Sequence, residues 1–86
     1  MLYFRAKVCK KMPANKQDEN IGRNISELRR KANLTQEELV AKMQVSGCDI
    51  SSGTLAKIEA GIRHLYANEL KSLKAVLNVE YEDILK

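Results

Sequence analysis

Residues 34–63, LTQEELVAKMQVSGCDISSGTLAKIEAGIR, decide the fold that we predict for this chain. Thr35 is followed three residues later by Glu38, which is the spacing of a capping box at the start of a helix. Ser51 is suited to cap a second helix, and Gly61 is suited to follow the end of that helix. The stretch therefore predicts two short helices that are joined by a compact connection.

Apolar side chains recur at helical spacing through the rest of the chain as well. We expect a helix over residues 21–32, with Asn20 as its N-cap and Asn33 in the left-handed conformation after its last turn. Two more helices are expected over residues 66–77 and 81–85. The apolar faces of the predicted helices contain Ile21, Ile25, Leu28, Ala32, Leu39, Val40, Met43, Leu55, Ile58, Leu70, Leu73, Val76, Leu77, Ile84 and Leu85. These patterns predict an all-α fold, a compact bundle of about five short helices.

The positive charge of the chain is concentrated near its beginning. The net charge is +4, and residues 1–17 carry five basic residues and no acidic one. Residues 18–86 carry ten basic and eleven acidic residues. We therefore expect residues 1–19 to form a basic, flexible tail and residues 20–86 to form the folded domain. The tail is either an arm that contacts DNA or a segment without such a role.

The composition argues against several classes of protein. Hydrophobic residues make up 44% of the chain and charged residues 30%, as in ordinary soluble domains. No apolar run has the length of a membrane span, and no export signal is recognised, so we expect a cytoplasmic protein without membrane contacts. Cys9 and Cys48 match no metal-ligand spacing, and His64 is the single histidine, so neither a metal nor another cofactor is expected. Cys48 is expected to be a small loop or core residue.

Catalysis is not expected from this sequence. A single histidine offers little for a nucleophile–base pair, and no glycine-rich phosphate loop is present. Nothing in the sequence indicates a small-molecule ligand. Two short helices that cross steeply are, in contrast, the unit with which many proteins place a helix in the major groove of DNA.

The chain resembles the phage-repressor and Cro-type helix-turn-helix domains, often called XRE-like. The resemblance covers roughly residues 20–86 and rests on many positions that match in order. These positions are Ile21, Gly22, Ile25, Leu28, Arg29, Leu34, Thr35, Gln36, Glu37, Glu38, Leu39, Ile50, Ser51, Thr54, Leu55, Ala56, Lys57, Ile58, Glu59, Gly61, Arg63 and residues 73–85. The resemblance implies a five-helix, lambda-repressor-like DNA-binding domain. It implies a repressor-like transcriptional regulator that binds a double-stranded DNA operator as a homodimer.

The same resemblance implies which residues contact DNA, namely Gln36, Ser51, Ser52, Gly53, Thr54, Lys57 and Arg63. Gln36 and Arg63 resemble residues that contact phosphates in the family, and the alternative for each is an ordinary solvated side chain. Thr54 and Lys57 have groups that reach base edges or phosphates. Gly53 is either a poor helix residue or a position that lets DNA approach closely.

Two features depart from the family pattern. The connection over residues 44–49 is longer by several residues, so either the first helix of the pair gains a turn or the connection loops out. The next helix opens with serines and a glycine, which cannot make the bidentate base contacts of Arg or Gln. Arg29 and Glu59 resemble the family's structural ion pair. The rival interpretation is a protein–protein interaction module that keeps this fold without specific DNA binding.

Overall fold

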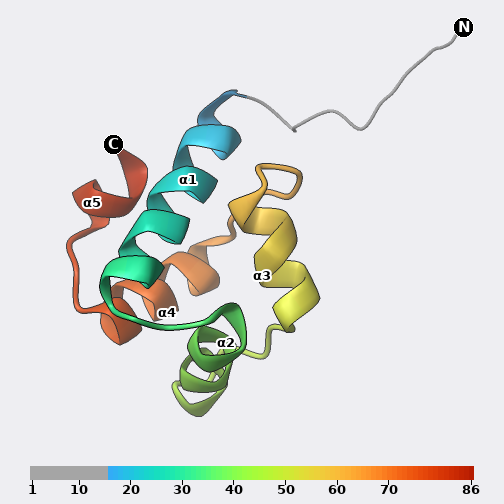
Figure 1. The fold of residues 1–86 in the computed structure, drawn as a ribbon, viewed down its shortest axis with the longest axis vertical. Helices are drawn as coiled ribbons and strands as arrows, with labels where there is room; N and C mark the ends of the chain where they lie inside the picture. The colour runs from blue at the N-terminus through green and yellow to red at the C-terminus, as the bar shows by residue number, and fades with distance from the viewer. Residues whose placement is uncertain (1–15) are drawn as a thin grey trace, which may run out of the picture.

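The computed structural model describes residues 16–86, and these residues form five α-helices (Figure 1). The helices are α1 (Lys16–Lys31), α2 (Gln36–Val45), α3 (Ser52–Glu59), α4 (Ala67–Leu77) and α5 (Tyr81–Leu85). No strand occurs within the described part of the chain. The predicted all-α bundle of five short helices is therefore confirmed. The tail expected over residues 1–19 lies mostly outside the described residues.

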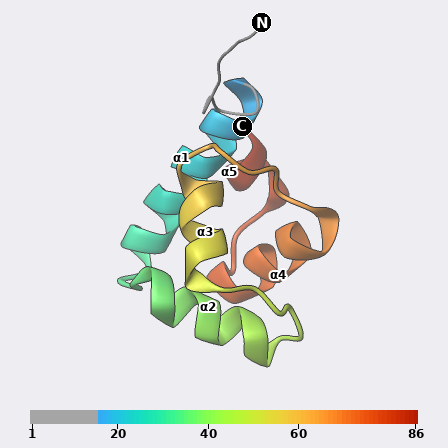
Figure 2. The same cartoon turned by 90° about the vertical axis from the view of Figure 1, so that its right-hand side faces the viewer.

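The five helices enclose one apolar core. α1 contacts α3 and α5, while α2 contacts α3 and α4, and Figure 2 shows α2 crossing below the foot of α3. Every helix contributes at least one side chain that is fully buried, and these side chains are Ile25, Leu39, Met43, Leu55, Ile58, Leu73 and Ile84. Ala32 and Leu85 were expected on apolar faces, but both are exposed because they lie at the ends of their helices.

The start of α1 corrects two predictions. The helix begins at Lys16, so Asn20 lies inside it and is not its N-cap, and residues 16–19 belong to the helix and not to a tail. Asp18 and Glu19 stand in the first turn, where the helix macrodipole favours acidic residues. Asp18 is also buried, and its Oδ2 lies 2.6 Å from Nδ1 of His64. This contact joins segments that are distant in sequence.

The caps predicted for α2 and α3 are present. The hydroxyl of Thr35 accepts a hydrogen bond from the Glu38 backbone N–H at 3.1 Å, and the Glu38 carboxylate accepts one from the Thr35 N–H at 2.8 Å. Ser51 caps α3, because its hydroxyl accepts a hydrogen bond from the Thr54 N–H at 3.1 Å. Asn33 adopts a φ of 60° after α1. These interactions fix the starts of α2 and α3 and the turn between α1 and α2.

The connection between α2 and α3 begins later than expected, because Gln44 and Val45 belong to α2. It covers residues 46–51, and two of its side chains, Cys48 and Ile50, are buried in the core. The side-chain amide of Gln44 donates a hydrogen bond to the carbonyl of Ile50 at 2.9 Å. Cys48 is thus a core residue, as predicted, and burial raises the pKa of its thiol. A protonated, buried thiol is an unreactive packing group.

Helices α1 and α3 approach each other most tightly at Gly22. A Cβ atom at this position would lie 2.3 Å from the carbonyl oxygen of Ile58 and 2.7 Å from that of Glu59. Both oxygens belong to the backbone of α3, so they cannot turn aside as a flexible side chain would. The distance between α1 and α3 therefore depends on the absence of a side chain at Gly22.

We expect Gly22→Ala to destabilise the fold although alanine is the better helix former. The added methyl group must push α3 away, and overpacking of this kind costs about 1–3 kcal/mol. The free energy of unfolding, measured by urea denaturation, should fall accordingly. Ser26→Ala on the same helix is the matched control and should leave it nearly unchanged. Equal stability of the Gly22→Ala variant and the wild type would contradict the close approach.

Candidate nucleic-acid interface

A buried ion pair joins α1 to the end of α3. Nε of Arg29 lies 2.8 Å from Oε2 of Glu59, and Nη2 of the same guanidinium donates to Oε1 at 3.1 Å. Only 11% of the Arg29 side chain and 7% of the Glu59 side chain are exposed. Nη1 of Arg29 also donates to the carbonyl of Leu34 at 2.9 Å, which fixes the turn before α2. The two residues expected to form a structural pair are thus in bidentate contact.

Gln36, the first residue of α2, belongs to the same network. Its Nε2 donates a hydrogen bond to Oε1 of Glu59 at 3.0 Å. Because a carboxylate only accepts hydrogen bonds, the amide NH₂ group must face Glu59 and the amide oxygen must face away from it. Gln36 is therefore a half-buried residue that links the start of α2 to α3. Its amide oxygen and second N–H remain available for another partner.

An open groove runs between the start of α2 and the first half of α3. Its lining consists of Arg29, Leu34, Thr35, Gln36, Glu37, Ser52, Gly53 and Ala56. The first backbone N–H groups of any helix lack partners within the helix, and the caps occupy those of Glu38 and Thr54 here. The residues that precede these two in their helices, Gln36 and Glu37 in α2 and Ser52 and Gly53 in α3, line the groove with their N–H groups. Helix N-termini attract anions, so this lining suits a phosphate group.

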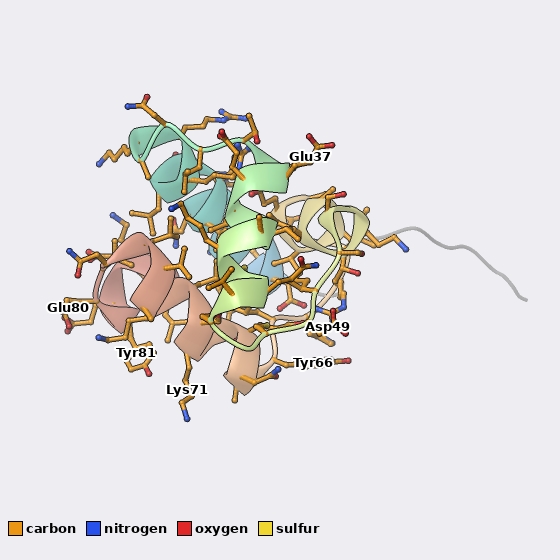
Figure 3. All side chains as sticks on the ribbon, turned by 90° about the horizontal axis from the view of Figure 1, so that it is seen from below. Glu37, Asp49, Tyr66, Lys71, Glu80 and Tyr81 are labelled. Carbon is orange, nitrogen blue, oxygen red and sulfur yellow. The ribbon has the colours of Figure 1, made fainter. Side chains whose placement is uncertain are left out.

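One acidic residue opposes this attraction. Glu37 lines the groove, and Figure 3 shows it at the start of α2, pointing away from the bundle. Its carboxylate repels a phosphate and reduces the effect of the helix N-termini. The groove therefore carries no strong positive charge of its own.

The outer side of α3 presents small side chains and one cation. Gly53 and Lys57 are both exposed and lie one helical turn apart. Within residues 16–86, no acidic side chain pairs with Lys57. The hydroxyls of Ser51 and Thr54 lie 2.9 Å apart and form a hydrogen bond with each other. Lys57 is thus the charged group that α3 offers to a ligand, while these two hydroxyls first serve the cap.

Arg63 lies outside the groove. It follows the C-terminal end of α3, and its guanidinium forms two hydrogen bonds with the Glu69 carboxylate, at 2.9 and 3.0 Å. The same guanidinium lies 4.6 Å above the ring of Tyr66. The hydrogen bond to Glu69 is the main reason that the pKa of Arg63 is raised. Arg63 is therefore held within the fold, and Glu69 compensates its charge.

The sequence did not reveal the acidic partners of Gln36 and Arg63, the two residues expected to contact phosphates. Gln36 lies 23 positions from Glu59, and no local pattern links the two. For Glu69 the sequence contained a weak signal, because it stands three residues after Tyr66. In the structure its carboxylate accepts a hydrogen bond from the Tyr66 N–H at 2.9 Å. That arrangement follows the spacing of a capping box, but tyrosine is not a usual cap residue. Pairing with Arg63 could be found only from the folded structure.

Comparisons with known proteins find no family model, no curated protein and no solved structure that matches this chain. Within residues 16–86, no helix has the length and apolar character required to cross a membrane. The same residues contain no group of three or more His, Cys, Asp or Glu side chains placed to hold a metal ion. Function must therefore be inferred from the fold and the groove.

We expect Glu59→Ala to destabilise the protein much more than Glu38→Ala. The first change leaves the buried guanidinium of Arg29 without its carboxylate, which costs about 3–5 kcal/mol. The second removes one exposed capping bond, which costs about 1 kcal/mol. Thermal unfolding of both variants measures the difference. Equal melting temperatures would show that the pair is not a structural requirement.

Proposed function

We propose that this protein is a repressor-like transcriptional regulator that binds DNA through a helix-turn-helix formed by α2 and α3. The observation that carries the proposal is the groove in which the start of α2 meets the first half of α3. In this proposal, α3 enters the major groove and the start of α2 contacts a phosphate. The likeness to the XRE-like domains, which the sequence suggested, supports the same function.

The position of α3 favours this proposal. In Figure 1, α3 forms the right-hand edge of the bundle, and Figure 2 shows it in front when the molecule is seen from that side. No other helix of the described residues covers its outer side in these views. An α-helix with its side chains is about 10–12 Å across, which fits the width of the major groove, about 12 Å. α3 can therefore contact base edges without any rearrangement of the bundle.

The charges indicate that each copy of the protein makes few phosphate contacts. Lys57 and the start of α2 supply contacts at the groove, while the guanidinium of Arg63 is shared with Glu69. A homodimer would double these contacts to about four and would read two half-sites about one helical turn apart. We therefore propose a homodimer that binds a pseudo-palindromic operator in the cytoplasm.

Selection of bound oligonucleotides from a random pool, at two salt concentrations, tests the function directly. We expect one sequence to be enriched, and its affinity to fall with salt with a logarithmic slope of about −2, because the two Lys57 side chains of a dimer neutralise about two phosphates. Lys57→Ala should make that slope less steep by about 1 for each phosphate that the lysine neutralises in the wild type. Lys71→Ala, which removes an exposed cation from α4, is the matched control and should leave it unchanged.

Failure to enrich any sequence, together with no salt-sensitive binding, would contradict the proposal. It would favour a protein–protein interaction module as the alternative function.

A specific observation supports that alternative. A second groove, richer in apolar surface, lies between the α2–α3 connection and α4 and is lined by Ser46, Gly47, Cys48, Asn68, Lys71, Ser72 and Ala75. Val45, close by in the chain, is 89% exposed.

A further inference from the structure

Three of the four glycines are required by the fold itself. Gly22 lies against backbone carbonyls of α3. Gly47 and Gly61 have φ angles of +102° and +80°, which side chains disfavour. At Gly61 a Cβ atom would in addition lie 2.9 Å from Cα of Glu19. Each of these positions would be strained by any other residue.

Gly53 differs from the other three. It lies within α3, outside the left-handed region, and it is exposed. A Cβ atom there would meet only the hydroxyl of Ser51, at 3.9 Å, which is an ordinary van der Waals distance. Glycine weakens a helix relative to alanine, because it loses more conformational freedom on folding. The fold therefore offers a reason against glycine at this position and no reason for it.

The position of Gly53 indicates what the absence of a side chain allows. The residue lines the groove together with Ser52 and Ala56, and Lys57 lies one turn further along the exposed side of α3. We propose that Gly53 is the point where α3 comes closest to DNA and that it sets how deeply the helix enters the major groove. This inference rests on the proposed function and names a residue that determines its specificity.

The physical reason is the short range of polar contacts. A methyl group at position 53 would hold the α3 backbone away from the DNA surface. Hydrogen bonds require donor–acceptor distances of about 2.5–3.2 Å, so the contacts of Thr54 and Lys57 would be lost or weakened together. A longer side chain at position 53 would weaken them further.

Gly53→Ala separates stability from DNA binding in a single variant. We expect its melting temperature to rise, but by less than about 4–8 °C, because alanine is the better helix former and position 53 lies in the first turn of α3 and not in its interior. We expect its affinity for the selected duplex to fall at least about tenfold, which is the effect of breaking one good base contact. Ser26→Ala, a change to alanine on α1 and outside the groove, is the matched control and should bind within about threefold of the wild type.

The possible outcomes are distinct. A Gly53→Ala variant that is more stable and binds DNA as tightly as the wild type overturns the inference, since the position then has no role in docking. A variant with a clearly lower melting temperature also overturns it, because glycine would then serve the fold. A wild type that binds no duplex contradicts the proposed function itself, whatever the variant does.

Discussion

The contact between Arg29 and Glu59 is the interaction on which the rest of the structure depends. Its guanidinium and carboxylate connect α1, the turn at Leu34 and the last residue of α3, and Gln36 adds the start of α2. Both charges are almost fully removed from water. A movement of α3 relative to α1 would separate them and leave a buried charge without a partner, which is strongly unfavourable. A change in the angle between α2 and α3 would break the hydrogen bond from Gln36 to Glu59. The geometry of the helix pair is therefore fixed before any ligand binds.

The same interaction limits the charge that the molecule can offer to a partner. Arg29 is fully occupied within the fold, and Arg63 is held by Glu69. A surface of this kind suits recognition by helix N-termini, by the single exposed cation of α3 and by close contact of backbone with DNA. It is less suited to strong, non-specific attraction of nucleic acids, which requires many free cations.

Local signals in the sequence predicted the helices well. The capping box that begins at Thr35, the serine cap of α3 and the helical spacing of the apolar residues each act within a few positions, so the sequence displays them directly. The predicted start of α1 was too late, because the helix already includes Lys16. The pairing of Arg63 with Glu69 was missed because these side chains meet only in the folded protein. Local structure could be predicted, whereas long-range polar partners required the fold.

A nuclear magnetic resonance titration of the isotopically labelled protein with its selected duplex tests the central claim most directly. We predict that the backbone amide signals of the groove, namely those of Gln36, Glu37, Ser52 and Gly53, move most, together with that of Lys57 on the outer side of α3. Signals of the second groove, such as those of Lys71 and Ala75, should stay in place. If the largest changes occurred on α4 and the residues of the first groove did not respond, the groove between α2 and α3 would not be the binding surface.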